Sequence, residues 1–420
     1  MRIINLNPDT NIGASAWFVE IEGHKILLDA GVHPKIDGRG GLPMFRYIAN
    51  EEVDAIAISH CHHDHVGSLP VAIRYFPHAN VLLSELSYFL VERVLHNSVN
   101  VMVRQRDEMG IKEYPLYSHD ELDEIAPLFQ GCRYNREVEW VAPKNLRRGF
   151  DSPTIEFLDA GHALGSAGLM VRGNKQTLFY TGDVCFHDQT LLRSARFEGA
   201  RAEVLIMETT RGNTAVAPDY SRQGEMDRLA MAINNVLKRR GSVLIPAFAL
   251  GRTQEILAML SVEMAAGKIP RQPIFIGGLG RVFTEIYDLE AHRTYRQHQN
   301  LRLTKALNLV VLEKGQAENM KLTGSPKIFV VTAGMMTEKT AAHDLAMRMA
   351  GEERHGIFFV GYSDPDTPAG RLKASKPGET FIFSPSGGEV TRRCDVQEFD
   401  LTAHAHRDDL LEFIAQVEPR

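Results

Sequence analysis

Four histidines and one aspartate stand close together in the run SHCHHDHVG, residues 59–67. His60 and His62 are two residues apart on a stretch expected to be extended, so their rings point the same way. Asp64 and His65 follow where a helix is expected to begin, and they can face a second point about one metal spacing away. Imidazole and carboxylate are ligands that suit zinc, and two ions about 3.5–4 Å apart can hold the attacking and leaving oxygens of a hydrolysis. The segment therefore predicts a metal centre with hydrolytic chemistry.

The residues between these ligands are predicted to have other roles. Cys61 and His63 occupy the intervening positions, where packing or support of the ligands is the expected function. Three more polar side chains follow strand-like runs: Asp29 in ILLDAGVHP, His162 in AGHALGSAG and Asp183 in YTGDV. A single residue of this kind is more often a cap or a core residue, so each gains meaning only from the others.

Composition restricts the class of protein. The chain has 420 residues, 44% of them hydrophobic, and a net charge of −6, which is typical of a globular protein with two or three domains and excludes a uniformly basic nucleic-acid coat. The four cysteines form no CxxC pair and indicate a reducing compartment, so a cytoplasmic location is expected. No signal peptide is evident, and no apolar run approaches the ~18 residues of a membrane span, so no membrane partner is expected.

Strand-like and helix-like runs place the candidate ligands. Short strands are expected at 17–23 and 24–31, and the β-rich run 53–59 ends at the histidine cluster. From about residue 208 long helices alternate with strands such as SVLIPAF and KIFVVTA, which indicates a parallel sheet flanked by helices. Residues 208–385 hold 23 Lys and Arg against 18 Asp and Glu, so a basic module is predicted within an acidic chain.

The order of these motifs resembles that of a known family. The run from His60 to His65, H-x-H-x-D-H, is similar to the signature of the metallo-β-lactamase fold, and Asp29, His162 and Asp183 match that family's first, third and fourth motifs in order. The later runs LIMETTRG, IPAFALGRTQEIL, VVTAGMMTEKTAAHDL, FFVGYSDPDTPAGRL and FDLTAHAHRDDLLEFI resemble the β-CASP branch, whose members cut RNA. The resemblance covers nearly the whole chain.

The resemblance implies a fold and a domain order. An α/β fold is expected, with a metallo-β-lactamase αββα sandwich beginning in residues 1–207. A β-CASP domain, a parallel sheet flanked by helices, is expected as an insertion at 208–385, and the chain returns to the first domain at 386–420. The family's motif C, a His-Gly after a further strand, has no counterpart after the helix RDDLLEFIAQ. Either the sequence is a shortened form, or the second metal has fewer protein ligands.

The resemblance also implies the members of the site. The implied metal ligands are His60, His62, Asp64, His65, His162 and Asp183. Asp183 is expected to bridge two Zn²⁺ ions, the second weakly held, with Mn²⁺ as an alternative cofactor. Asp64 and Asp29 complete the catalytic set with Glu208, at family motif A, and His404, at motif B; Asp29 is expected to orient the loop below the metals. A carboxylate beside an imidazole fits a protonated His404 that donates to the leaving 3′-oxygen.

These inferences predict a zinc-dependent phosphodiesterase that hydrolyses single-stranded RNA through metal-bound hydroxide, with His404 as general acid. Two alternatives are a non-catalytic subunit of an RNA-processing complex and a small-molecule metallo-hydrolase. The inserted module argues against the small-molecule enzyme, and six intact ligands argue against the scaffold. Relatives often dimerise, which makes a homodimer a candidate assembly.

Several residues keep two interpretations. Arg211, Arg252 and Lys373 are candidates for substrate binding, but Arg211 can equally form a surface ion pair, and Arg252, at an expected helix start, can serve domain packing. His406 either supplies the missing metal ligand or is an exposed histidine at a helix start. The loop 334–343 either holds a phosphate or caps a helix.

Overall fold

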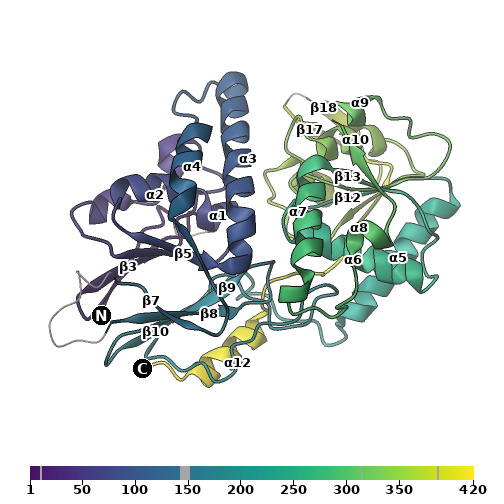
Figure 1. The fold of residues 1–420 in the computed structure, drawn as a ribbon. Coiled ribbons are helices and arrows are strands. Elements are labelled where there is room, and N and C mark those ends of the chain that lie inside the picture. The colour runs from purple at the N-terminus through teal and green to yellow at the C-terminus, as the bar shows by residue number, and fades with distance from the viewer. Residues whose placement is uncertain (10–11, 142–151, 314, 386) are drawn as a thin grey trace. The chain divides into compact units, whose positions relative to one another are not determined.

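The protein is described by a computed structural model that covers residues 1–9, 12–141, 152–313, 315–385 and 387–420. The described chain forms two compact units, and Figure 1 shows the elements of each. Unit 1 comprises Met1–His187, Ser194–Ala215 and His404–Arg420, and unit 2 comprises Asp188–Arg193 and Val216–Ala403. None of the helices in the described ranges has both the length and the apolar character needed to cross a membrane.

The first sheet of unit 1 carries the histidine-rich segment. Its strand order is β1-β2-β3-β4-β5-β6, antiparallel from β1 to β3 and parallel from β3 to β6. The strands are β1 (Arg2–Asn5), β2 (Trp17–Ile21), β3 (His24–Leu28), β4 (Ala55–Ile58), β5 (Asn80–Ser84) and β6 (Phe129–Cys132). All four residues of β4 are buried, because a central parallel strand is covered on both faces. The sequence AIAI satisfies that requirement, and the first polar residues after it belong to the histidine cluster.

The second sheet of unit 1 packs against the first. Its order is β11-β10-β9-β8-β7, antiparallel except for β10 and β11. The strands are β7 (Glu137–Glu139), β8 (Thr154–Asp159), β9 (Ala167–Arg172), β10 (Thr177–Tyr180) and β11 (Val204–Ile206). Ile26 and Leu28 of the first sheet share one buried core with Phe157 and Leu169 of the second. Each such side chain contributes roughly 1.5–3 kcal/mol when it leaves water.

Helices cover the outer faces of both sheets in unit 1 (Figure 1). The first sheet is covered by α1 (His63–Val66), α2 (Leu69–Tyr75), α3 (Glu85–Met109) and α4 (His119–Ile125). The second is covered by α12 (Arg407–Val417), whose Leu410 and Phe413 share a core with Phe179 and Phe197. Short 3-10 turns lie at Gly38–Gly41, Phe45–Ile48 and Ala126–Leu128. The predicted αββα sandwich is confirmed.

Unit 2 is built on one parallel sheet of order β14-β13-β15-β12-β16-β19. The strands are β12 (Val243–Pro246), β13 (Ile274–Gly277), β14 (Leu309–Leu312), β15 (Ile328–Val331), β16 (Gly356–Phe359) and β19 (Asp395–Glu398), with a hairpin of β17 (Thr380–Ser384) and β18 (Gly388–Thr391). The helices are α5 (Arg222–Lys238), α6 (Arg252–Ala265), α7 (Gly278–Leu289), α8 (Leu303–Ala306), α9 (Gln316–Asn319), α10 (Ala341–Met349) and α11 (Pro368–Ala374), and a 3-10 turn spans Glu290–Arg293. The predicted parallel sheet flanked by helices is confirmed.

The chain passes from one unit to the other more than once. Strand β19 pairs with β16, so the sequence stays in unit 2 up to residue 403, beyond the predicted limit of 385. The segment Asp188–Arg193 also belongs to unit 2, where the Glu255 carboxylate accepts the backbone N–H groups of Thr190 (2.6 Å) and Leu191 (2.9 Å). The predicted domain limits of 1–207, 208–385 and 386–420 stay a prediction beside these compact units.

Candidate metal centre

The candidate ligands lie in loops that follow buried strands of unit 1. After β4, Ser59 and His60 remain in the core, and His62 is extended (φ −71°, ψ 149°) at the start of α1. This backbone turns His60 and His62 toward the same point, as their spacing predicts. His162 comes from the loop after β8, and Asp183 comes from the loop after β10.

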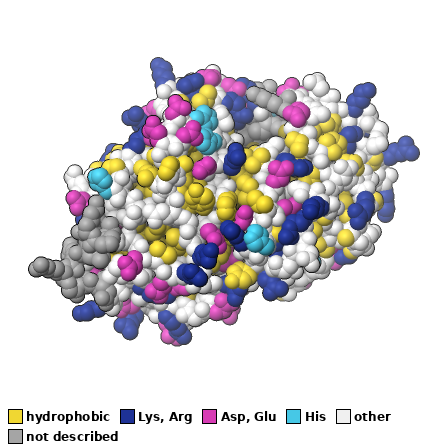
Figure 2. Space-filling model, in the orientation of Figure 1, with side chains coloured by type: hydrophobic (Ala, Val, Ile, Leu, Met, Phe, Trp, Pro, Cys, Tyr) yellow, Lys and Arg dark blue, Asp and Glu magenta, His cyan; other side chains and the backbone are white. Residues whose placement is uncertain are grey.

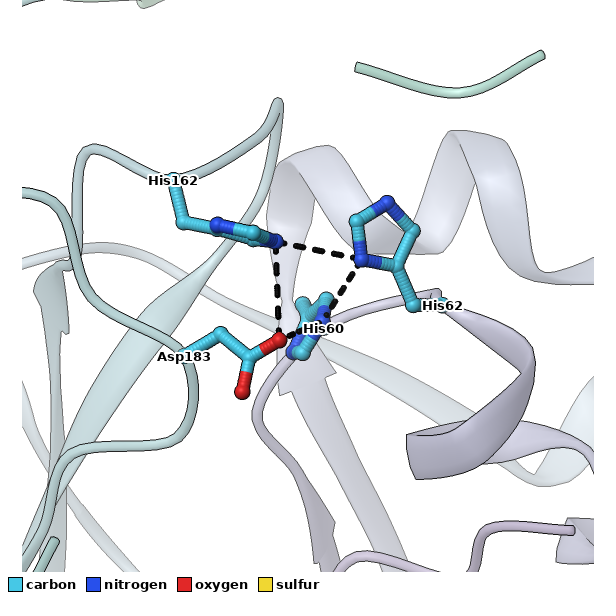
Figure 3. Close-up of side chains that lie close together, drawn as sticks. All are labelled: His60, His62, His162 and Asp183. Carbon is cyan, nitrogen blue, oxygen red and sulfur yellow. Dashed lines mark hydrogen bonds and ion pairs between the residues drawn. The ribbon is translucent and has the colours of Figure 1, made fainter. Parts of the chain in front are cut away.

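Four side chains converge in what we call the first cluster: His60, His62, His162 and Asp183 (Figure 3). His62 Nδ1 lies 3.0 Å from His60 Nε2 and 3.1 Å from His162 Nε2. Asp183 Oδ2 lies 3.5 Å from His60 Nε2 and 3.6 Å from His162 Nε2. Zinc–nitrogen bonds of about 2.0–2.1 Å in a tetrahedron separate neighbouring ligand atoms by about 3.3 Å. The first cluster therefore has the donor types and spacing that a zinc-sized ion requires.

A second group faces the other oxygen of the same aspartate. Asp183 Oδ1 lies 3.3 Å from His65 Nε2, and Asp64 Oδ2 lies 4.0 Å from that nitrogen. The two carboxylate oxygens of Asp183 are thus directed at two different sets of ligands, since Oδ2 belongs to the first cluster. The structure brings together all six predicted ligands, and the bridging role of Asp183 stays a prediction.

Asp29 supports this arrangement from below. It is fully buried, and its carboxylate accepts hydrogen bonds from Ser59 N (2.7 Å), Ser59 Oγ (2.8 Å) and Tyr180 Oη (2.5 Å). The same carboxylate lies 2.7 Å from His65 Nδ1, which fixes the proton on Nδ1 and leaves Nε2 to face Asp183. Asp29 positions the loop and one ligand, as the family's first motif implies.

Two features of the supporting loops were not predicted from the sequence. Tyr180 is the last residue of β10, and its hydroxyl joins Asp29 to Ser15 Oγ (3.0 Å). Gly182 has φ +53°, and a Cβ there would lie 2.7 Å from Ser59 Cβ. Glycine is therefore required between Thr181 and Asp183 for the Asp183 carboxylate to approach the loop after β4.

The pKa directions follow from burial and from the neighbouring charges. Burial, with help from His65, holds the pKa of His60 well below its ordinary value, so His60 is neutral and has a lone pair for a metal. Burial also acts against charged His65, but Asp183 and Asp29 outweigh it and hold the His65 pKa well above normal. Burial acts against ionised Asp183, yet His65 holds the Asp183 pKa well below normal. The carboxylates of Asp183 and Asp29 therefore stabilise a positive charge at this site. A metal cation would supply that charge by displacing the proton from His65 Nε2.

Glu208 and His404 form a pair beside the first cluster. His404 Nδ1 lies 2.9 Å from Glu208 Oε2, and Glu208 Oε1 accepts the backbone N–H of Val184 at 2.6 Å. The His404 ring lies 4.6 Å from the ring of His162. Burial lowers the pKa of His404, but the charge and hydrogen bond of Glu208, with Asp183 and Asp64, raise it to about 9. His404 is therefore protonated at neutral pH.

The intervening and flanking residues have other surroundings. The Cys61 thiol is buried and donates to the Ser87 carbonyl (3.4 Å), and burial raises its pKa to about 12. His63 is exposed at the start of α1. His406 stands at the start of α12, but only 4% of it is exposed, and its ring lies 5.4 Å from the ring of His187. The expectation of an exposed His406 is wrong, because the helix start turns the ring inward. In the described chain, His406 belongs neither to the first cluster nor to the second group that could hold a metal, Asp183 with Glu208 and His404.

The predicted substrate-binding residues have the following places. Arg211 lies half-buried in the turns after Glu208. Arg252 begins α6, and its Nη2 donates to the carbonyl oxygens of Val360 (3.0 Å) and Leu401 (2.5 Å). Lys373 Nζ lies 2.5 Å from Glu398 Oε1. In the loop 334–343, Thr340 Oγ1 accepts the His343 N–H at the start of α10 (3.4 Å), so this loop does cap a helix.

Two family models match this chain. A model described as the metallo-beta-lactamase superfamily matches residues 9–235. The chain therefore belongs to the metallo-beta-lactamase superfamily. A model of the Beta-Casp domain matches residues 253–372, all within unit 2, and identifies the branch that the later motifs resemble.

Individual relatives extend the match to the whole chain. It is 26% identical to "Endoribonuclease ysh-1" of Neurospora crassa and to "Endoribonuclease YSH1" of Saccharomyces cerevisiae, each over 99% of this chain but only 51% and 53% of those proteins. It is 28% identical to "Probable RNase MJ4" of Methanocaldococcus jannaschii, over 100% of this chain and 91% of that protein. The chain thus spans about half the length of the two fungal relatives. A crystal structure of a protein of unknown function from Enterococcus faecalis V583 has the same fold, with a TM-score of 0.55 at 15% identity, covering 97% of this chain and 90% of that one.

Proposed function

We propose that the chain is a zinc-dependent phosphodiesterase that cleaves single-stranded RNA. One observation carries the proposal: the two oxygens of Asp183 face two sets of ligands, while the Glu208–His404 pair stands beside them. Two adjacent cation positions with a protonated histidine at their side suit hydrolysis of a phosphodiester. A cytoplasmic location belongs to the proposal and is supported by four free, buried cysteines.

The proposed function assigns the candidate ligands to two metal ions. His60, His62 and His162 would hold the first ion, Asp64 and His65 would hold the second, and Asp183 would contribute to both. When bound, such ions act as Lewis acids toward a phosphoryl oxygen and make water a stronger nucleophile at neutral pH.

His404 would supply the proton for the leaving 3′-oxygen. Glu208 accepts from Nδ1 and holds the ring in one orientation, so the proton to be transferred is the one on Nε2. Burial acts against the charged ring, but the Glu208 carboxylate, which is not among the proposed metal ligands, raises the pKa of His404 and favours the protonated ring at neutral pH. Asp29 never meets the substrate in this scheme; it keeps His65 and Ser59 in place.

RNA is the proposed substrate because three relatives are named as ribonucleases. The charge of the chain is consistent with a polyanion, since residues 208–385 are basic although the whole chain is acidic. Figure 2 shows Lys and Arg side chains spread over the surface and mixed with acidic ones. Contacts of such basic side chains with phosphates would position a single strand without selecting its bases.

The proposal is tested with the purified chain, freed of metal by a chelator and reloaded with Zn²⁺ or with Mn²⁺. A 5′-labelled unstructured RNA and a DNA of the same sequence serve as substrates. We expect cleavage of the RNA only after reloading, with two ions bound at the candidate metal centre. Metal-loaded protein that leaves the RNA intact would contradict the proposal and favour the non-catalytic alternative.

A further inference from the structure

Helices α3 and α4 face each other through two matched pairs of side chains. His96 and Asn100 are four residues apart on α3, and His119 and Asp123 are four residues apart on α4. Residues at this spacing lie on one face of a helix, so each helix offers one imidazole and one oxygen atom to the other. Histidine lies among acidic side chains on the face over these helices in Figure 2.

The contacts between the helices are reciprocal. His96 Nε2 lies 3.5 Å from Asp123 Oδ1, and His119 Nε2 lies 3.3 Å from Asn100 Oδ1. Carboxylate and amide oxygens only accept hydrogen bonds, so each Nε2 is the nitrogen that carries a proton, and in the neutral ring Nδ1 then keeps its lone pair. Oxygen acceptors behind the outer ring nitrogen are the usual partners that orient metal-bound histidines.

The inner nitrogens of the two rings then face each other. His96 Nδ1 lies 2.8 Å from His119 Nδ1, and the ring planes differ by only 12°. Two lone pairs at this distance repel each other unless a positive species lies between them. The geometry points to a cation site, and we propose that His96 and His119 bind a borderline divalent ion such as Zn²⁺ through their two Nδ1 atoms.

The surroundings of the pair fit this kind of ion. Imidazole selects zinc, copper or nickel over magnesium and calcium, which prefer oxygen ligands. Zinc–nitrogen bonds of about 2.0–2.1 Å need the two nitrogens about 3.3 Å apart, half an ångström more than in the structure. The His96 side chain is 31% exposed and His119 is exposed, so small rotations can open the gap, and water can fill the remaining coordination positions.

Such an ion would connect α4 to the long helix α3. Ser118 caps α4 by accepting the Glu121 N–H (3.1 Å), and the helix has only seven residues. A ligand that binds only the folded arrangement stabilises it in proportion to its concentration and affinity. The site is independent of the proposed function, because it shares no residue with the candidate metal centre.

The test is a zinc titration of the full chain by equilibrium dialysis, with magnesium as the comparison ion. We expect wild-type protein to bind one more zinc than His96→Ala and His119→Ala, and its melting temperature to rise further with zinc than theirs. His78→Ala, an exposed histidine elsewhere in unit 1, is the matched control and should behave as wild type. Equal zinc counts in wild type and both variants would overturn the proposal.

Two variants test the outer oxygens without removing a histidine, so they stay informative if an alanine variant fails to fold. Asp123→Ala removes the acceptor behind His96 and should weaken the additional site ~10-fold, as is typical of such partners. Asn100→Asp replaces an amide by a carboxylate and should tighten it. If the Asn100→Asp variant binds no additional zinc, the cation site is refuted. The two Nδ1 atoms then share a proton, or the wild-type Asn100 amide is turned so that its NH2 group donates to His119 Nε2 and the ring proton lies on Nδ1.

Discussion

Strands end in polar loops in both units, but the side chains in those loops have different uses. In unit 1, the loops after β4, β8 and β10 direct imidazole and carboxylate groups at one another across 3.0–3.6 Å. In unit 2, the residue that opens the helix after β12 is Arg252, whose guanidinium donates to two backbone carbonyls of the same unit. A strand end therefore supplies only a position, and the side chains decide whether that position binds a ligand or holds the fold together.

Among substitutions that compare the two units, Asp183→Ala in unit 1 should cause the largest loss of bound metal and RNA cleavage. In the proposed site this change removes a ligand of both ions, so bound metal and RNA cleavage should both fall. Activity should drop by more than the ~10–100-fold typical of residues that only support ligands. Metal analysis and a cleavage assay on the same preparation measure both. His298→Ala, an exposed histidine of unit 2, should change neither. Full activity in Asp183→Ala would remove the bridging role.

The next effect should fall within unit 1 and distinguish proton transfer from metal binding. His404→Ala should lower RNA cleavage by ~10²–10⁴-fold, the usual worth of general acid catalysis, while bound metal is unchanged. An activated aryl phosphodiester, whose leaving group needs no proton, should lose far less activity. Glu208→Gln should show the same pattern more weakly, because the imidazole remains. Metal lost together with activity would instead make His404 a ligand.

The smallest effects should come from unit 2. Arg252→Ala breaks two charge-assisted hydrogen bonds to carbonyls and should destabilise the protein by about 1.5–3 kcal/mol. Lys373→Ala removes a partly exposed ion pair with Glu398 and should cost less than about 1 kcal/mol. Urea denaturation measures both.

RNA binding at several salt concentrations tests the same two variants for the predicted substrate role. If a side chain contacts a phosphate, its removal should lower the slope of log affinity against log salt concentration by about one. We expect Lys373→Ala to change the slope more than Arg252→Ala, since the Arg252 guanidinium is already bonded to the unit. The reverse order would show that Arg252 exchanges its carbonyl partners for phosphate.

The local parts of this structure could be predicted from the sequence. The AIAI strand before the histidine cluster and the two-residue spacing of His60 and His62 depend on neighbours in the chain, and both are as expected. The order of the motifs, interpreted through the family, led to Asp183 and to the pairing of Glu208 with His404.

What could not be predicted depends on contacts between distant residues. Nothing near Tyr180 in the sequence indicates that its hydroxyl binds Asp29, 151 residues away. His406 was expected on the surface because a helix start is usually exposed, but the ring packs beside His187. The pairing of His96 with His119 could not be predicted for the same reason. Each is an ordinary polar residue of its own helix, and the contact exists only because α4 packs on α3.

The position of His404 after unit 2 has a consequence for how the protein is made. Every member of the first cluster has been synthesised once translation passes Asp183, whereas Glu208 must wait for a histidine 196 residues further on. On the ribosome, the side chains proposed to hold a metal therefore exist before the proposed proton donor, and all of unit 2 is synthesised between the two events. A nascent chain interrupted within unit 2 would carry the first cluster without the histidine proposed as its proton donor.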